Sequence, residues 1–334
     1  MKRSIKIFSL FLLLANAVFA KNTGDTESEK SKNYSKTYAV GSNDKIVLSN
    51  TFGDLRISTW AKNEIKVDVT ITVKARTDER AQKIMDRIAI EDGKNGAEIF
   101  FKTRVGDKND DDGGGEQHNN ENSSFKINYT VYLPAYATLD ASNSFGELSI
   151  GDYDGTITLT SSFGMLTAGK LAKPKKVNLQ FGKKTSVIEG MDGGTLRIGF
   201  SKAQVNKLSG DVVADLNQTG AILLKLDNGL KKLDLKNNFG NVFIDAPKNL
   251  NANFRIKTSF GNFSNQSSFA VGKSGDDDDD DERGAFNSRS YAGKAGSGTA
   301  PVTIKSNFGK ITLGHDLSPD ALTAGKATGK PSRS

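Results

Sequence analysis

Short alternations of apolar and polar residues, separated by polar turns, run along most of the chain. In one unit Ile157 and Leu159 alternate with threonines, Phe163-Gly164 follows, and Leu166 begins the next alternation. The segments 233–244 and 304–313 repeat this order. Alternation with period two places the apolar side chains on one face of a β-strand. The pattern therefore predicts an all-β protein built from many short strands.

The dipeptide Phe-Gly marks an internal repeat. It occurs at Phe52-Gly53, Phe145-Gly146, Phe163-Gly164, Phe181-Gly182, Phe239-Gly240, Phe260-Gly261 and Phe308-Gly309, with Phe200-Ser201 as a degenerate copy. From Phe145 to Phe200 the copies are 18, 18 and 19 residues apart, and Phe260 follows Phe239 by 21. The 39 residues between Phe200 and Phe239 fit two units, one of which lacks its Phe.

A unit of 18 to 21 residues is too short for a propeller blade of about 40 residues and suits one coil of a parallel β-solenoid. Stacked coils would lie about 4.8 Å apart, with equivalent Phe rings above one another as an internal ladder in the core. The glycine after each Phe would supply a bend or a positive φ. We therefore predict an all-β parallel β-solenoid, with a β-sandwich as the alternative.

The ends of the chain differ from the repeat. Residues 1–20 carry Lys2, Arg3 and Lys6 before an apolar stretch, which predicts a secretory signal peptide cleaved after Ala20. The polar segment 21–37 is expected to be disordered, and 316–334 to be a flexible tail. The solenoid is predicted over 137–315.

Residues 38–136 are less repetitive and are predicted to be a β-rich cap on the solenoid. Strands are expected near residues 46–48, 55–57, 65–73, 98–102 and 126–133. Thr77 can cap a short helix that has Ala81, Ile84, Met85 and Ile88 on one face.

Two acidic, low-complexity inserts interrupt the pattern. Residues 106–124 contain three consecutive glycines among Asp residues, and residues 272–300 contain the run Asp276–Asp281. Both are expected to leave the coil as loops. The first begins like a calcium loop at Asp107, but Asp112 stands where the turn glycine belongs and His118 where the bidentate glutamate belongs. Solvated loops are the favoured interpretation.

Charge and composition limit the function classes. The net charge of +7 falls to +4 once the three cations of the leader are removed, and the basic residues are scattered, so we expect no nucleic-acid partner. No second apolar stretch approaches about 18 residues, so we expect no integral membrane segment after cleavage. The chain is predicted to be exported, to the periplasm, the cell surface or the medium.

Candidate chemistry is sparse. The chain has no cysteine and two histidines, His118 and His315, and no serine lies in a G-x-S-x-G elbow. We therefore expect no enzyme and assign no catalytic, cofactor or metal residues. The alternative is a polysaccharide-processing enzyme whose paired acids align on one edge, although turn formation explains these acids equally well. The acids are Asp152, Asp154, Asp192, Asp211 and Asp227. Trp60 and Tyr153 could stack on a sugar or be ordinary surface aromatics.

The segments Asn50–Ile57 and Asn143–Ile150, with Tyr129–Pro134 before the second, resemble the signature of an uncharacterised family of Bacteroidetes-like bacteria named "putative adhesin". The resemblance covers residues 38–315, apart from the two acidic inserts. It implies a β-solenoid with no established activity, and it defines no site residues.

The sequence thus favours an exported, non-enzymatic binding or adhesion protein that recognises a glycan or a protein through its repeated surface. A periplasmic structural or envelope-signalling accessory protein is the alternative. Ligand identity, biological process and oligomeric state do not follow from the sequence.

Overall fold

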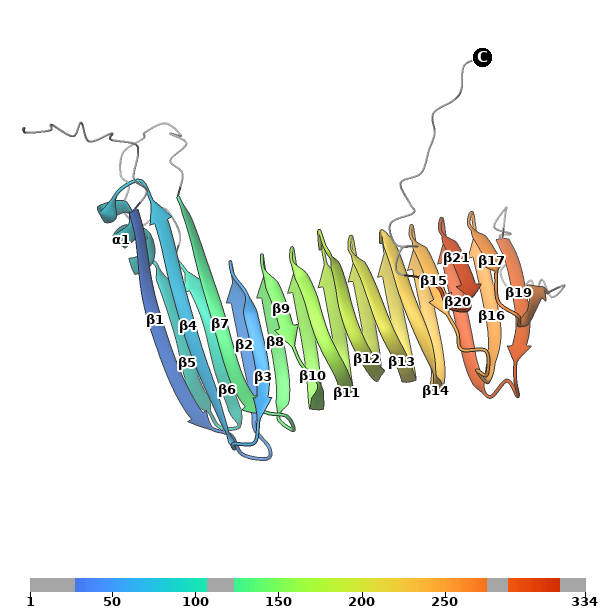
Figure 1. The fold of residues 1–334 in the computed structure, drawn as a ribbon, viewed down its shortest axis with the longest axis horizontal. Coiled ribbons are helices and arrows are strands. Elements are labelled where there is room, and N and C mark those ends of the chain that lie inside the picture. The colour runs from blue at the N-terminus through green and yellow to red at the C-terminus, as the bar shows by residue number, and fades with distance from the viewer. Residues whose placement is uncertain (1–27, 107–122, 275–287, 319–334) are drawn as a thin grey trace, which may run out of the picture.

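The computed structural model describes residues 28–106, 123–274 and 288–318. These residues form 21 strands and one helix, and all the strands join one mixed, open hydrogen-bonded sheet (Figure 1). The predicted all-β class is confirmed. The predicted leader and the run Asp276–Asp281 lie outside the described residues, as do most of the first acidic insert and of the tail.

The N-terminal part combines antiparallel and parallel pairs. Its strands are β1 (Ser28–Ala39), β2 (Lys45–Thr51), β3 (Leu55–Trp60), β4 (Glu64–Ala75), β5 (Ile88–Asn95), β6 (Glu98–Val105) and β7 (Ser124–Pro134). Strands β1, β4 and β7 are antiparallel neighbours, and β5 and β6 form an antiparallel hairpin. Strand β6 then pairs in parallel with β2, and β7 in parallel with β3. All five predicted strands are present.

Strand β1 corrects the expectation that residues 21–37 are disordered. From Ser28 onward this polar segment pairs with β4 along all twelve residues of the strand. Tyr34 and Tyr38 pack against the core, and both hydroxyl groups donate to Asp92. The composition suggested disorder because few apolar residues are present, but the backbone bonds to β4 and two tyrosines are sufficient.

The predicted helix is α1 (Asp78–Asp86), and its cap is confirmed. The Thr77 side chain accepts a hydrogen bond from the Arg80 N–H at 3.2 Å, as an N-cap residue does. Ala81 and Met85 are buried, whereas Ile88 belongs to β5 and not to the helix.

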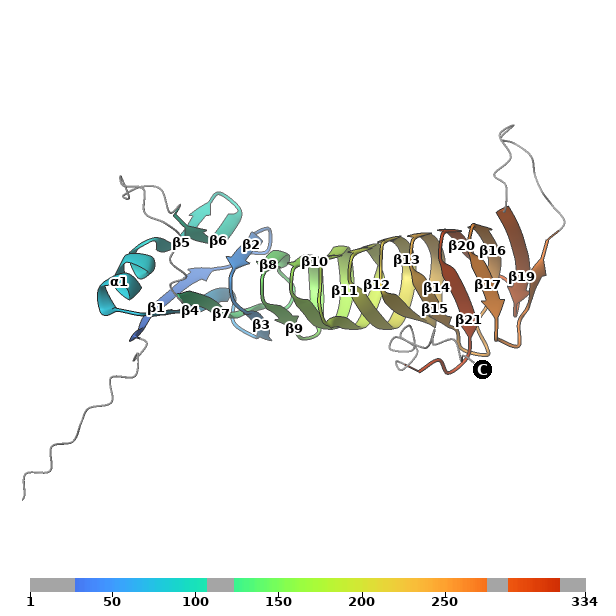
Figure 2. The ribbon, with the colours of Figure 1, turned by 90° about the horizontal axis from the view of Figure 1, so that it is seen from above.

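The central part is a stack in which each long strand serves two faces. Its strands are β8 (Thr138–Ser144), β9 (Glu147–Ile150), β10 (Tyr153–Ser162), β11 (Met165–Gln180), β12 (Thr185–Gly199), β13 (Lys202–Asn217), β14 (Ala221–Asn238) and β15 (Asn241–Asp245). Strands β8 and β10 pair in parallel on one face, and β9 and the first part of β11 on the other (Figure 2). Between Leu171 and Lys176 the register shifts where β11 passes from one face to the other.

The core lies between the two faces and consists of apolar side chains in register. One row runs across eight neighbouring strands, and all its members are buried: Ala141, Leu159, Val177, Leu196, Ala214, Leu235, Ile304 and Ile256. Each added strand covers the row beneath it, so burial accumulates along the stack.

In the C-terminal part, the order of the strands in the sheet differs from their order along the chain. Its strands are β16 (Ala252–Ser259), β17 (Asn262–Asn265), β18 (Ala270–Lys273), β19 (Ser288–Ala295), β20 (Ala300–Asn307) and β21 (Lys310–Gly314). Strand β20 lies between β14 and β16, and β19 pairs antiparallel with the outer side of β16. The expectation that 272–300 is one loop is therefore wrong from Ser288 to Ala295, where β19 covers the otherwise open edge of β16.

The predicted internal Phe ladder is wrong about its place. The eight rings stack on one another, but each of these side chains is 37–52 % exposed at a bend between two strands. Leu139, Ala141 and Asn143 point inward, and period-two alternation would continue this to Phe145. Phe145 instead has φ of 58°, which turns its side chain outward.

The glycine after each Phe has a different role from the one expected. The positive φ belongs to the Phe, and none of these glycines has one. A Cβ on Gly146 would collide with the carbonyl oxygen of Gly53, and a Cβ on Gly164 with that of Gly146. Glycine is therefore required at these two bends because the backbones approach too closely for a side chain, whereas Ser201 is accommodated after Phe200.

We expect Gly164→Ala to lower the free energy of unfolding by about 2 kcal/mol or more, because its Cβ would enter the backbone of the neighbouring coil. Gly151→Ala is the matched control in the same stack, since a Cβ there meets nothing within 4 Å. Urea unfolding of both variants measures the difference. Equal stability would contradict the close approach of the backbones.

Candidate functional site

The bends carrying Phe form one continuous edge of the stack, here called the Phe edge. Its members in spatial order are Phe52, Phe145, Phe163, Phe181, Phe200, Gln218, Phe239, Phe308 and Phe260. Neighbouring rings lie 4.7–5.1 Å apart between centroids with interplanar angles of 5–14°. Phe125 closes the N-terminal end by packing edge-on against Phe52 at 5.0 Å.

Gln218 takes the place of the missing Phe. Its φ is 47°, and its N–H donates to Asn238 as the Phe200 N–H donates to Asn217. The prediction that one of two units between Phe200 and Phe239 lacks its Phe is confirmed. The ladder is therefore divided into a run of five rings and a run of three.

Keeping the rings at the surface costs conformational energy. A positive φ is a rare state for a bulky residue and costs about 1–3 kcal/mol, and here it recurs at eight Phe positions. Stacking between aromatic rings contributes about 0.5–1.5 kcal/mol per pair and offsets part of this cost. Folding alone therefore gives no reason for this long apolar strip to be exposed.

The stacking determines which part of each ring a ligand can reach. A ring between two neighbours has both faces covered, so only its edge, which carries a partial positive charge, points to solvent. Flat stacking on a sugar is therefore restricted to the ends of the two runs. Along its length, the Phe edge offers a straight, apolar ridge.

Buried amides hold the bends from inside. The Asn143 amide donates to the carbonyl oxygens of Gly53 at 2.9 Å and Glu147 at 3.1 Å. The Asn237 amide donates likewise to Gly240 at 3.0 Å. The Gly53 carbonyl thereby gains a partner, and the Gly240 carbonyl accepts from both Asn237 and the Lys310 N–H.

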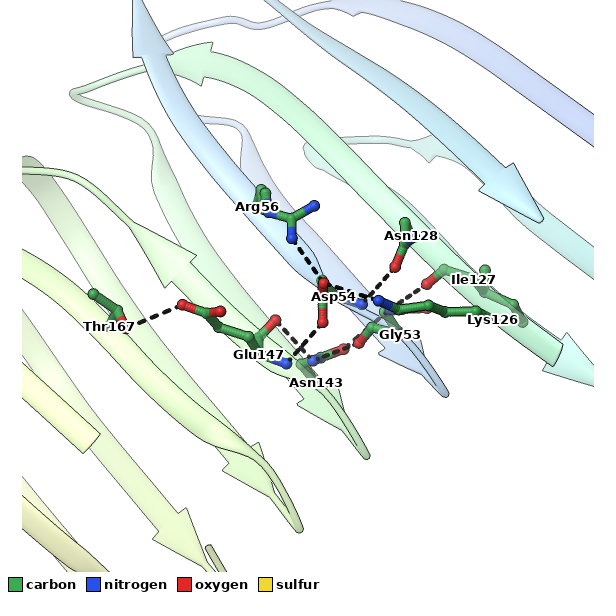
Figure 3. Close-up of polar contacts among 10 residues, drawn as sticks. Gly53, Asp54, Arg56, Lys126, Ile127, Asn128, Asn143, Glu147 and Thr167 are labelled. Carbon is green, nitrogen blue, oxygen red and sulfur yellow. Dashed lines mark hydrogen bonds and ion pairs between the residues drawn. The ribbon is translucent and has the colours of Figure 1, made fainter. Parts of the chain in front are cut away.

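Asp54 organises the N-terminal end of the Phe edge (Figure 3). Its carboxylate accepts from the Glu147 N–H at 3.2 Å and lies 2.8 Å from Arg56 Nη2 and 3.3 Å from Lys126 Nζ. Its own N–H donates to Asn128 Oδ1 at 3.0 Å. Burial alone would raise the pKa of Asp54, but the hydrogen bond from Glu147 and the two cations outweigh it, so the pKa lies below its usual value.

An open hollow of about 500 Å³ adjoins this end. Phe52, Phe125 and Phe145 supply its apolar wall, and Lys74 and Lys126 its charged rim. Both lysines have acidic partners, Glu29 at 3.2 Å for Lys74 and Asp54 for Lys126. The hollow therefore continues the apolar surface of the Phe edge, and the charges of its two lysines are balanced by acids.

Of the five acids considered for a polysaccharide-processing site, Asp154 and Asp211 are exposed on strands, and the other three accept hydrogen bonds. Asp152 accepts from the Lys170 N–H, Asp192 from the Ser209 hydroxyl and Asp227 from the Gly229 N–H. Within the described ranges, no group of three His, Cys, Asp or Glu side chains could hold a metal ion. Asp107, where the segment that resembles the start of a calcium loop begins, lies outside those ranges, as does His118.

The other sequence candidates have structural surroundings. Tyr153 is fully buried and donates to the Ala137 carbonyl at 2.7 Å, so the expectation of a surface aromatic is wrong there. Trp60 stacks on Tyr132 and donates to the Glu64 carbonyl. His315 Nδ1 lies 2.6 Å from the Ala246 carbonyl oxygen, with Phe269 against the ring.

Sequence reasoning assigned the Phe residues to the core, yet a signal of their exposure was present. The next buried apolar residue follows at a distance of three, as Leu166 follows Phe163 and Val242 follows Phe239. An odd spacing breaks the period of two, which means that one intervening residue has left the strand conformation.

None of the helices in the described part of the chain is long and apolar enough to cross a membrane.

We expect Gln218→Phe to raise the free energy of unfolding by about 1 kcal/mol or more, because the new ring gains two stacking partners, Phe200 and Phe239. Gln218→Leu is the control, since it has the same backbone conformation and no ring. Thermal unfolding compares the three chains. A Tm for Gln218→Phe no higher than for Gln218→Leu would show that ring stacking contributes nothing at this edge.

We expect Asp54→Asn to destabilise the fold by about 1–3 kcal/mol at pH 7, because the hydrogen-bonded carboxylate is charged there and only 15 % exposed. Since its folded pKa is lowered, its contribution is complete above the unfolded pKa of about 3.9 and disappears as the pH falls through the folded pKa. Urea unfolding from pH 7 to pH 2 should show the two chains converging.

Asp140→Asn is the control for this experiment, because its ion pair with Lys45 is 40 % exposed on the Asp140 side and should change stability little at any pH. A difference between wild type and Asp54→Asn that is independent of pH would contradict the charge-based role of Asp54.

No protein-family profile and no curated protein matches the sequence. Among solved structures, the chain is similar to a "putative cell adhesion protein" from Clostridium sporogenes, with 13 % identity, 86 % of this chain and 100 % of that chain covered, and a TM-score of 0.24. It is also similar to a "putative adhesin" from Parabacteroides distasonis, with 11 % identity, 85 % and 97 % covered, and a TM-score of 0.35.

A third similar structure is a "putative lipid binding protein" from the same species, with 13 % identity, 84 % and 96 % covered, and a TM-score of 0.35. At these identities and TM-scores, we base neither fold nor function on the likeness.

Proposed function

We propose that the chain is an exported, non-enzymatic binding protein of the adhesion type, in which residues 137–315 form a parallel β-solenoid capped by residues 38–136. Its ligand is a glycan or a protein, bound along the repeated surface, and the resemblance of its Phe-Gly elements to the "putative adhesin" family supports the adhesion type. The observation that carries the proposal is the Phe edge, because eight aromatic side chains remain exposed at a conformational cost.

Exposed apolar strips of this size on soluble proteins mark interaction sites. The Phe edge is ordered, since each ring stacks on its neighbours and the bends at Phe145 and Phe239 are held by the buried amides of Asn143 and Asn237. A ligand would therefore meet an ordered surface and lose little side-chain entropy from the protein on binding. Aromatic side chains are also common among the residues that dominate binding energy.

The parallel pairing supports the solenoid interpretation. Strands β10 to β14 pair in parallel with their chain neighbours on each side, at spacings of one repeat. A solenoid presents every position of the repeat as a row, which suits a ligand that is itself extended.

The proposal is tested by measuring adhesion of beads coated with the purified chain to immobilised polysaccharides and proteins. The double variant Phe163→Ser/Phe181→Ser should bind at least tenfold more weakly, because it removes two adjacent rings from the edge. Tyr136→Ser and Val213→Ser are matched controls, since both side chains are exposed to a similar degree, 48 % and 50 %, away from the edge.

Far-UV circular dichroism and the Tm show whether each variant is folded, and Phe163→Leu/Phe181→Leu provides a second, less disruptive pair. Equal binding by all these variants would contradict a role for the Phe edge. An absence of binding to any coated surface would favour the periplasmic structural role instead.

A further inference from the structure

The C-terminal half of the Phe edge is flanked by cations on one face of the stack. Lys236, Lys305 and Lys257 precede Phe239, Phe308 and Phe260 by three residues each. The three lysines are in register, since Lys236 pairs with Lys305 and Lys305 with Lys257. On the other side of Lys236 the row continues with the exposed Asp215 and Arg197, so its net charge remains positive. Neighbouring strands lie about 4.8 Å apart, so three positive charges form a closely spaced row.

The opposite face carries a second set. Lys202 and Lys310 follow Phe200 and Phe308 by two residues, and Lys183 and Lys184 follow Phe181. All four side chains are exposed, as are the three lysines of the first row. The cations thus stand on both sides of the rings.

The N-terminal half of the edge lacks this arrangement. Ser49, Ser142 and Thr160 occupy the positions three residues before Phe52, Phe145 and Phe163. Two residues after Phe52 and Phe145 stand Asp54 and Glu147. The positive charge is therefore a property of one half of the edge and not of the repeat as such.

None of the seven lysines has an acidic side chain within 4.0 Å among the described residues, unlike Lys225, 3.9 Å from Asp245, and Lys232, 2.8 Å from Asp234. Other exposed lysines such as Lys173 share this property, so the distinguishing feature of the seven is their position beside the exposed rings. Like charges opposite one another destabilise a sheet. Their accumulation beside exposed rings indicates an anionic partner.

We propose that the half of the Phe edge from Phe181 to Phe260 docks on the surface of a bilayer that contains anionic lipids. The ring edges enter the boundary between headgroups and acyl chains, and the lysines contact lipid phosphates. Lysines three residues behind the rings lie about 10 Å from them along the strand. This matches the depth of about 5–10 Å to which apolar side chains of surface-bound proteins enter a bilayer.

The placement of the cations favours a bilayer over an acidic polysaccharide. A single polymer chain lying on one face would contact the lysines of that face and leave those of the other face unused. A planar anionic surface that meets the stack at its edge reaches the lysines of both faces and the rings together. The proposal goes beyond the adhesive function above and does not depend on it.

The test is co-sedimentation of the full chain with vesicles of phosphatidylcholine alone and of equal parts phosphatidylcholine and phosphatidylglycerol. We expect binding to the anionic vesicles only. The triple variant Lys236→Gln/Lys305→Gln/Lys257→Gln should bind about 100-fold more weakly, given the usual contribution of each lysine near an anionic surface. These side chains are exposed, so folding should be unaffected.

The control is Lys173→Gln/Lys175→Gln/Lys231→Gln. These exposed lysines lie where β11 and β14 pass between the two faces, and the variant has the same net charge as the test variant. Equal loss of binding in both triple variants would show that net charge alone is responsible and would overturn the proposal. The same holds if the wild type does not bind anionic vesicles.

The rings are tested separately. Phe308→Ser should weaken binding to anionic vesicles at unchanged charge, whereas Phe163→Ser, at the neutral half of the edge, should leave it unchanged. The Tm of both variants controls for folding, and a fluorophore that reports apolar surroundings, attached at Phe308→Cys, should shift on binding. Unchanged binding by Phe308→Ser together with an unshifted fluorophore would overturn insertion of the edge.

Discussion

The fold depends on how closely two backbones can approach at the bend after each Phe. Parallel hydrogen bonding requires each repeat to follow the path of its neighbour, and at several bends the carbonyl oxygen of one glycine lies where the Cβ of the next would be. A Cβ does not fit at Gly146 or Gly164, whereas Ser201 and Thr219 occupy the same position at two other bends. The residue before this position takes the positive φ at each bend, with its N–H bonded to the neighbouring repeat.

Because of this constraint, residues at the same position of successive repeats lie side by side in rows. Inside, the rows are apolar, with buried amides such as Asn143 and Asn237 at the bend. Outside, the same register aligns Phe rings and, over three strands, lysines. A single exposed Phe has little effect on the surface, but a Phe at the same position of successive repeats forms a continuous apolar row.

The resulting surface suits contact along a line. The described hollow beside Phe52 is open and its lysines are paired with acids, and Asp192 accepts a hydrogen bond from Ser209 on the neighbouring strand. Charge differs along the edge, because Asp54 and Glu147 lie near one end and exposed lysines near the other. Gln218 stands at the interruption between the five-ring and three-ring runs.

Much of the architecture could be predicted from local patterns. Period-two alternation identified the strands near Ile65 and Lys126, the Phe-Gly spacing identified the repeat, and the 39-residue interval identified the unit that contains Gln218, since these are short-range consequences of strand geometry. The cap at Thr77 followed from hydrogen-bonding chemistry within one turn.

Three features were decided by tertiary structure. The side on which each Phe lies depends on one dihedral angle, φ of the residue at the bend, and at Phe145 this bend lies where the backbones of Gly53 and Gly146 meet across 93 residues of sequence. The order of β14, β20 and β16 depends on which edges remain open late in the chain. The lysines at 236, 305 and 257 became one row only because that order brings their strands together, so neither the exposed rings nor the charged half of the edge could be predicted from residues considered along the chain.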